Sequence, residues 1–276
     1  MIRFIRFGTC APWKRVMEIE VIILPNVEGR DKIESWLEPY IKAMGADVST
    51  IILEEDMDTD FLKREFDSHD GIIVVGAAGN ISEVKKIADV LGLELEVNEE
   101  ALNNLKAYYM DTLDVPENLD EMATIPEFSY PIPNVRGPVA GFVALSLEDD
   151  RFIAATPSSF SETIEVFETG IQDFIREKTG KRYSVTFSIQ LETTVNKAGE
   201  IAKRVEKIFN EVFVRLDGRF TNAGIPLVCT VFASDPEELS MIHEKLNNYI
   251  REITEKSGIR VIEKKNNRDD WGSELF

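Results

Sequence analysis

The residues most able to do chemistry are small ones that follow the apolar run Ile72–Val75. The run leads into Gly76-Ala77-Ala78-Gly79-Asn80, and an amphipathic helical pattern begins at once. This order predicts a buried strand, a tight turn and a helix start. In an open α/β sheet ligands bind outside the carboxyl ends of strands, where small residues let backbone N–H groups approach a phosphate. The residues leave two interpretations open, an anion-binding turn or a plain strand-to-helix turn in which small residues relieve crowding.

Composition limits the classes of function. The chain has 276 residues, enough for two domains, and a net charge of −19. Nucleic-acid binding needs Lys and Arg to neutralise phosphates, and binding to anionic lipid needs a basic surface, so we expect neither partner. The two cysteines, Cys10 and Cys229, lie far apart, and the histidines are His69 and His243. This argues against a Cys/His zinc site or a disulfide framework and favours the cytoplasm.

Hydrophobic periodicity predicts the elements that would position the turn. Strands are expected at Glu18–Leu24, Asp47–Leu53 and Gly71–Val75, separated by helices, the first of them opened by Asp31 as N-cap. This β-α-β-α-β-α order predicts a parallel sheet with helices on both faces. Further expected elements are paired strands at Gly141–Leu147 and Arg151–Ala155, a helix at Glu162–Glu177, and a loop with one short helix at Thr112–Pro133.

A second pattern follows a boundary at Thr179-Gly180-Lys181. A strand at Tyr183–Glu192, a helix at Lys197–Asn210, strands at Val212–Arg219 and Ile225–Ala233, and a helix at Pro236–Lys256 give the order βαββα. The predicted divisions are a leader at 1–16, a first domain at 17–178, a smaller α+β domain at 183–265 and a tail at 266–276. Translation from Met17 would remove the leader, and the residues do not distinguish the two starts.

Three segments of the sequence resemble motifs of a known protein family. Gly76 to Ile81 stands where a family motif reads Gly-Gly-x-Gly-Pro-Thr, and Asn134, Gly137 and Gly141 have the spacing Asn-x-x-Gly-x-x-x-Gly. Thr156 to Thr163 occupies the place of Leu-Pro-Gly-Pro-Pro-Ser-Glu-Met. Together they resemble the molybdopterin-binding domain family (MoaB/Mog type), and more closely its CinA-like branch, over most of Glu18–Gly170. The second part looks like the KH-related module that follows this domain in CinA proteins. The resemblance implies a three-layer α/β fold with a parallel sheet.

The sequence departs from these motifs where the chemistry would be. Ala77 replaces the second glycine of the turn, and Val84 stands where the motif has an acid. The first loop is shorter and keeps at most Glu28, Gly29 and Asp31 of its motif. Pro-Gly-Pro-Pro has become Pro-Ser-Ser-Phe.

The resemblance also implies an activity. CinA-like members act as metal-dependent pyrophosphatases on ADP-ribose-type nucleotides, and MoaB-like members bind or adenylylate molybdopterin. Both tasks need a divalent cation, Mg²⁺ or Co²⁺, held by carboxylates beside phosphate oxygens. The candidate ligands are Glu28, Asp31, Glu83 and Glu162, and the first three are the ones predicted to hold the metal. Each has a structural alternative, since Asp31 could be an N-cap, Glu83 could complement a helix dipole and Glu162 could belong to a cap.

Our leading hypothesis is a CinA-like protein that binds a phosphate-bearing nucleotide or pterin with weak or no catalysis. One alternative is a working nucleotide pyrophosphatase in which Glu28, Asp31 and Glu83 rebuild the metal site, and another is an assembly protein whose turn holds nothing. The second part lacks the Gly-x-x-Gly loop that clamps RNA, so we expect it to pack or to form a homo-oligomer. The predicted ligand-binding residues are Gly76, Ala77, Ala78, Gly79, Asn80, Asn134, Gly137, Gly141, Pro157 and Ser158.

Overall fold

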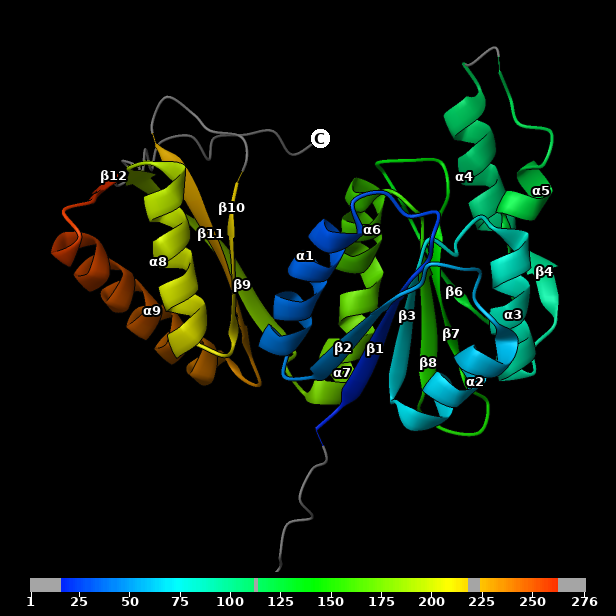
Figure 1. The fold of residues 1–276 in the computed structure, drawn as a ribbon, viewed down its shortest axis with the longest axis horizontal. Coiled ribbons are helices and arrows are strands. Elements are labelled where there is room, and N and C mark those ends of the chain that lie inside the picture. The colour runs from blue at the N-terminus through cyan, green and yellow to red at the C-terminus, as the bar shows by residue number, and fades with distance from the viewer. Residues whose placement is uncertain (1–15, 112–113, 218–223, 263–276) are drawn as a thin grey trace, which may run out of the picture.

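Two separate β-sheets organise the chain in the computed structural model, which describes residues 16–111, 114–217 and 224–262 (Figure 1). The predicted tail at 266–276 and all of the predicted leader except residue 16 lie outside the described residues. No helix among the described residues is long and apolar enough to cross a membrane.

The first sheet has six strands in the order β2-β1-β3-β8-β7-β6. The pairs β1/β2, β1/β3 and β3/β8 are parallel, whereas β7 pairs antiparallel with both of its neighbours. The predicted α/β class with a mainly parallel sheet is therefore confirmed. The strands are β1 (Glu18–Ile23), β2 (Asp47–Ile52), β3 (Gly71–Val75), β6 (Tyr130–Ile132), β7 (Gly141–Leu145) and β8 (Phe152–Thr156).

Helices cover both faces of this sheet (Figure 1). On one face lie α1 (Arg30–Ala43), α6 (Phe160–Val166) and α7 (Gln172–Thr179), and on the other lie α2 (Thr59–Ser68) and α3 (Ile81–Leu91). The N-cap of α1 is Gly29, not Asp31 as predicted, and Asp31 lies in the first turn. Gly29 has φ +70, a left-handed conformation that glycine adopts without strain, so the helix begins one residue before the expected cap.

The predicted helix at Glu162–Glu177 is longer and contains a π-helical turn. It runs from Phe160 to Thr179 as α6 and α7, joined by the π turn Phe167–Ile171. Gly170 lies in this turn, and a Cβ added to it would lie 2.8 Å from Ile132 in β6. The glycine thus lets the helix approach the edge of the sheet closely.

The segment predicted as a loop at Thr112–Pro133 contains more structure than expected. Besides the short helix α5 (Leu119–Met122) it holds β5 (Thr124–Pro126) and β6. β5 pairs antiparallel with β4 (Leu95–Val97), and this small sheet adjoins α4 (Glu99–Tyr109). Strands of three residues have too little periodicity to be read from a sequence.

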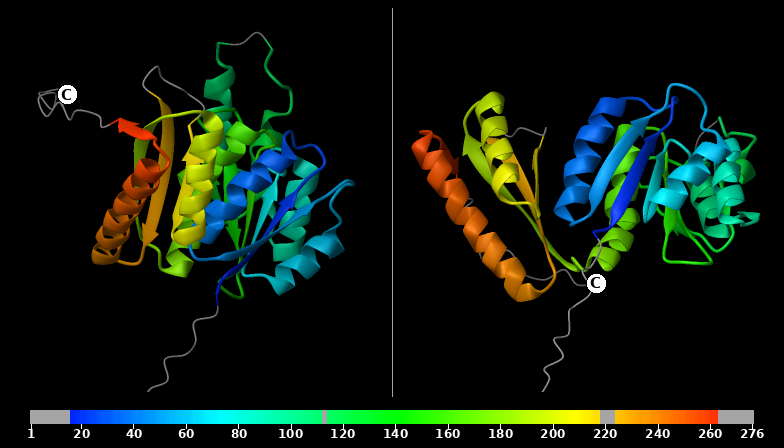
Figure 2. Two further views of the ribbon diagram at one scale, coloured as in Figure 1. Left: turned by 60° about the vertical axis from the view of Figure 1, so that its left-hand side comes forward. Right: turned by 60° about the horizontal axis from the view of Figure 1, so that its bottom comes forward.

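The second sheet has the order β10-β11-β9-β12 and is antiparallel throughout. Two helices, α8 and α9, cover one of its faces (Figure 2). The predicted βαββα order is present, with the short strand β12 added at the end. The elements are β9 (Tyr183–Glu192), α8 (Val195–Ile208), β10 (Val212–Leu216), β11 (Ile225–Ala233), α9 (Pro236–Lys256) and β12 (Arg260–Ile262).

Aromatic rings join the two sheets. Phe213 of β10 and Phe232 of β11 belong to the hydrophobic core of the first sheet rather than to that of the second. The ring of Tyr40 on α1 lies 4.5 Å from the Phe213 ring and 5.5 Å from the Phe232 ring, and Trp36 lies 5.4 Å from Phe213. The face of the second sheet that α8 and α9 leave open is therefore packed against α1.

Candidate functional site

The turn after β3 is attached to the neighbouring strand β8. The amides of Gly76 and Ala78 both donate to the carbonyl oxygen of Thr156, at 2.9 and 3.1 Å, and the amide of Asn80 donates to Ala77 O at 3.1 Å. The Asn80 side chain accepts from the amide of Ser82 and caps α3. Three of the five predicted amide donors therefore have partners within the protein.

The other two predicted segments reach the same edge of the sheet. A Cβ added to Gly79 would lie 2.8 Å from Cγ1 of Val139, so the loop between β6 and β7 lies directly against the turn. In the same loop Asn134 donates from Nδ2 to Oε2 of Glu162 at 2.7 Å and to the Val139 carbonyl oxygen at 2.9 Å. The structure thus brings together the three segments that the motifs single out.

Glu162 closes this group from the start of α6. Its Oε1 accepts from the hydroxyl of Ser159 at 3.0 Å, and its amide donates back to Ser159 Oγ, so Ser159 and Glu162 form the cap of the helix. A Cβ added to Gly137 would lie 2.1 Å from Oε2 of Glu162, which explains the glycine. Gly141 is required in the same way, because its Cβ would lie 2.2 Å from Val166.

Side chains cover the turn where a phosphate was expected to approach. A Cβ on Gly76 would lie 2.6 Å from Val27 and 2.8 Å from Asn26, two residues of the loop after β1. Ala77 is fully buried and Ala78 is only 8% exposed. Pro157 is also buried, whereas Ser158 is half-buried and its hydroxyl has no hydrogen-bond partner among the described residues.

The three carboxylates predicted to hold a metal do not form a group. Glu28 and Asp31 are exposed, whereas Glu83 is buried in the first turn of α3 and forms an ion pair with Lys86 at 2.6 Å. Among the described residues, no set of three ligating side chains includes any of them. The three carboxylates therefore do not converge on one divalent cation in the way that the resemblance implies. The Mg²⁺ or Co²⁺ site stays a prediction without a ligand set in this structure.

A pocket of about 260 Å³ adjoins the Asn134 loop. Asn104 and Tyr108 of α4 line it, together with Asn134 and Gly137. Tyr108 is 52% exposed. Sequence reasoning missed this wall of the pocket, since nothing in the α4 pattern shows which loop the helix will meet.

A second cluster of polar side chains lies outside the predicted site. Glu20, Glu65 and His69 bring one potential metal-ligating atom each within 4.8 Å of one another. Burial raises the pKa of Glu20, and hydrogen bonding from Ser49 and the neighbouring His69 oppose that rise. The four-residue spacing between Glu65 in α2 and His69, the C-cap of that helix, was a readable signal. Their position beside Glu20 depends on how α2 packs on the sheet.

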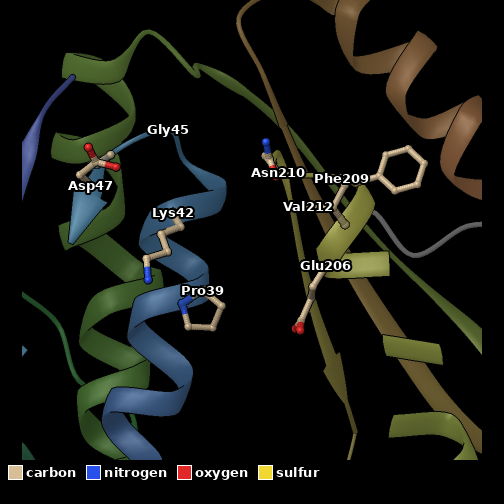
Figure 3. Close-up of a pocket in the computed structure, with 9 residues that line it drawn as sticks. Pro39, Lys42, Gly45, Asp47, Glu206, Phe209, Asn210 and Val212 are labelled. Carbon is tan, nitrogen blue, oxygen red and sulfur yellow. The ribbon is translucent and has the colours of Figure 1, made fainter. Parts of the chain in front are cut away.

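A larger hollow of about 490 Å³ lies between α1 and the start of β10 (Figure 3). Lys42 and Asp47 line it from the first part of the chain, and Glu206, Phe209 and Asn210 line it from the second. Its charged groups come from both parts without converging on one point in Figure 3.

A sequence relative supports the family. The chain is 29% identical over 173 residues to a CinA-like protein of Sulfurihydrogenibium sp. (strain YO3AOP1), and the match covers 59% of this chain and 43% of that protein. Over this stretch the chain is similar to a CinA-like protein. It nevertheless spans less than half the length of that relative.

Other relatives and solved structures share lower sequence identity with this chain. A protein of Pyrobaculum arsenaticum (strain DSM 13514 / JCM 11321 / PZ6) is 23% identical over 232 residues, with 80% of this chain and 84% of that protein covered. The crystal structure of CinA from Thermoplasma acidophilum has a TM-score of 0.47 at 19% identity, covering 58% of this chain and 98% of that one. MoaB from Pyrococcus furiosus, described as a tungsten cofactor synthesizing protein, has a TM-score of 0.34 at 11% identity, covering 61% and 99%. No protein-family model matches the chain.

Proposed function

We propose that this CinA-like chain binds a small phosphate-bearing molecule, a nucleotide or a pterin, at the carboxyl edge of its first sheet and does not hydrolyse it. The observation that carries the proposal is the convergence of the turn after β3, the Asn134 loop and the start of α6 beside a pocket. In open α/β sheets this edge is where ligands bind.

The volume of the pocket favours a ligand with a single ring system over a whole dinucleotide. Its volume of about 260 Å³ lies just below the range of about 300–1,000 Å³ typical of small-molecule sites. The exposed ring of Tyr108 offers a surface for stacking an aromatic ring, and the side-chain amide of Asn104 offers donors and an acceptor to its edge.

Arg136 supplies the positive charge for the phosphate. It belongs to the same loop as Asn134, and its side chain is 60% exposed. Its Nε donates to Glu165 at 3.1 Å, which leaves the terminal guanidinium N–H groups for phosphate oxygens. The phosphate would thus bind at the exposed rim, because side chains of the protein cover the amides of the turn.

The placement of the carboxylates supports binding without hydrolysis. Metal-dependent cleavage of a pyrophosphate needs a cation clamped between carboxylates and phosphate oxygens. Glu28 and Asp31 are exposed, and Lys86 already neutralises Glu83. We therefore infer binding without turnover.

The test measures thermal unfolding of the full chain with AMP, ADP-ribose or a pterin monophosphate, with and without Mg²⁺ or Co²⁺. We expect stabilisation, worth about 2.7 kcal/mol at a ligand concentration of 100 times Kd, and no AMP release from ADP-ribose. Tyr108→Ala is expected to weaken binding, whereas Tyr183→Ala, which removes an exposed tyrosine on β9, is not.

Two outcomes would contradict the proposal. Release of AMP would establish the pyrophosphatase alternative. A lack of stabilisation by every ligand would favour the assembly protein, and sedimentation of the full chain would then show whether copies associate.

A further inference from the structure

A carboxylate lies buried inside the first sheet, far from the carboxyl edge. Glu20 is the third residue of β1, paired with Ser49 of β2 and Ile72 of β3, and it is 3% exposed. Its Oε1 is buried without a hydrogen-bond partner, and no lysine or arginine among the described residues pairs with it. A buried charge is costly unless it is paired or binds a metal.

His69 faces this carboxylate through its Nε2 atom. Its Nδ1 lies 2.8 Å from the carbonyl oxygen of Glu65, and a carbonyl only accepts, so Nδ1 carries the proton. In the neutral ring Nε2 then presents a lone pair to Oε2 of Glu20, 3.3 Å away. Oε2 also accepts from the hydroxyl of Ser49 at 2.5 Å. Two acceptors therefore face each other and need a positive species between them.

We propose that Glu20, Glu65 and His69 form a binding site for a divalent transition-metal ion of the zinc type. One donor atom from each lies within 4.8 Å of the others. Two ligands of a tetrahedral Zn²⁺, with bonds of about 2.0–2.1 Å, lie about 3.3 Å apart, and the observed separation of Glu20 Oε2 and His69 Nε2 is 3.3 Å.

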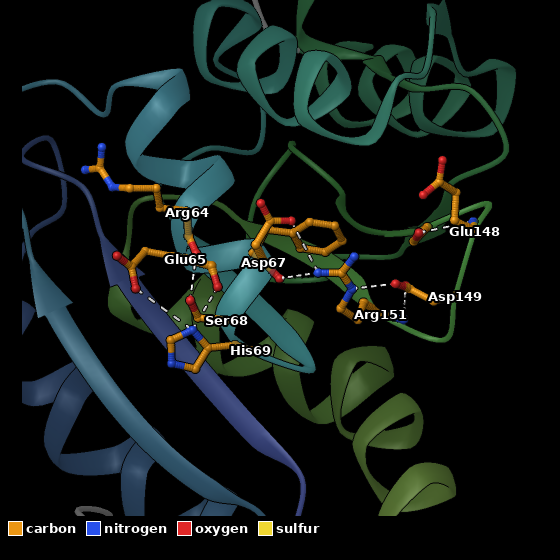
Figure 4. Close-up of polar contacts among 10 residues, drawn as sticks. Arg64, Glu65, Asp67, Ser68, His69, Glu148, Asp149 and Arg151 are labelled. Carbon is orange, nitrogen blue, oxygen red and sulfur yellow. Dashed lines mark hydrogen bonds and ion pairs between the residues drawn. The ribbon is translucent and has the colours of Figure 1, made fainter.

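The third ligand and the charge balance agree with this assignment. The Glu65 side chain is 23% exposed, and its Oε2 lies 3.9 Å from Nδ1 of His69 (Figure 4). We infer that a change of the Glu65 rotamer would complete the ligand set. Two carboxylates and a neutral imidazole cancel the charge of a divalent ion, and no lysine or arginine among the described residues pairs with Glu65.

The hydrogen bonds around His69 and Glu20 match those that orient metal ligands in other metalloproteins. A ligating histidine usually donates its other ring N–H to a carbonyl or carboxylate, and ligating carboxylates usually accept a further hydrogen bond. Here Glu65 O and Ser49 Oγ play these two parts. The ion would join α2 to β1 at the opposite end of the sheet from the proposed ligand pocket. A failure of one proposal therefore leaves the other unaffected.

The experiment uses the untagged full chain with Cys10→Ser, because thiols and histidine tags bind zinc. After removal of metal with a chelator, calorimetric titration with Zn²⁺ is expected to show one strong site and a raised Tm. Co²⁺ in its place is expected to give the intense visible absorption of a tetrahedral ion. The chain has only two histidines, so NMR of the imidazole nitrogens should show the His69 ring shifting while His243 does not.

Variants separate this site from adventitious binding. Glu20→Gln keeps the volume and removes a buried charge, so it should fold, and we expect it and His69→Gln to weaken Zn²⁺ binding by about 100-fold or more. Ser49→Ala should weaken it by about tenfold, as expected for an outer-shell partner. His243→Gln, on α9, should bind as tightly as the parent chain. Equal binding by all variants, or no binding by the parent chain, would overturn the proposal and leave a proton shared by His69 and Glu20.

Discussion

The side chain of Val139 lies against Gly79, at the point where the loop before β7 meets the turn after β3. A Cβ on Gly79 would lie 2.8 Å from Val139 Cγ1, and Gly79 has φ +77. This contact ties two of the three loops of the candidate site together. It also covers the backbone that a phosphate was expected to approach.

Gly79→Ala is therefore expected to destabilise the chain by two effects. The left-handed backbone costs about 1–2 kcal/mol for a residue with a Cβ, and the overlap with Val139 adds about 1–3 kcal/mol. Gly92→Ala is a matched control, because Gly92 has φ +68 and nothing within 4 Å of an added Cβ. Urea unfolding should give a larger loss for Gly79→Ala, and Val139→Ala in the same chain should recover part of it. Equal losses at Gly79 and Gly92 would show that the Val139 contact is unimportant.

Phe213 should couple the unfolding of the two sheets. It is 3% exposed, and it packs against Trp36 and Tyr40 although it belongs to β10. Phe213→Ala is expected to cost about 3–5 kcal/mol and to split one calorimetric transition into two. Phe209→Ala, which removes a half-buried ring that contacts Tyr249 within the second part, should lower stability without such a split. A single transition in the Phe213 variant would contradict this coupling.

Glu238 should make stability depend on pH in the acid range. Its Oε2 accepts from the Ser234 amide at 2.6 Å, and Lys181 lies 3.0 Å from Oε1; these contacts lower its pKa below the ordinary value of 4.5. A carboxyl with a lowered pKa stabilises the fold above the pKa of the unfolded chain, and this stabilisation disappears as the pH falls through the pKa of the folded state.

Glu238→Gln is thus expected to lose about 0.5 kcal/mol at neutral pH, since the pair with Lys181 is partly exposed. The difference from the parent chain should vanish below the folded-state pKa. Glu237→Gln, one residue earlier in the same turn of α9 and exposed, serves as the control. Denaturant unfolding at a series of pH values gives the free energy of unfolding of each variant and of the parent chain as a function of pH. A constant difference at every pH would contradict the assignment.

Cys229 should react only when the chain unfolds. It lies in β11, is fully buried, and burial raises the pKa of its thiol to about 12. The thiolate is the reactive form, so labelling of a Cys10→Ser chain by a disulfide reagent at pH 8 should be as slow as global unfolding. Denaturant should make labelling immediate. Fast labelling of the native chain would show local opening of the second sheet.

Local patterns predicted most elements of this chain. The strands at Gly71–Val75, Tyr183–Glu192 and Ile225–Ala233 and the helix at Pro236–Lys256 have the predicted bounds. Asp235 caps that helix, with the Glu238 amide donating to its carboxylate at 2.8 Å. These elements are long or strongly periodic, so their own residues contain the signal. Strands β4, β5 and β6 are too short for that.

The sequence by itself determined the α/β architecture and the order of the motifs that resemble those of CinA-like proteins, because periodicity and spacing are properties of neighbouring residues. Only the tertiary structure decided what surrounds each motif. It placed Val27 and Val139 over the predicted phosphate turn, left Glu28 and Asp31 exposed, and brought Glu20 to His69 across about 50 positions of sequence. Such contacts depend on how helices pack on a sheet, which the spacing of residues along one element does not specify.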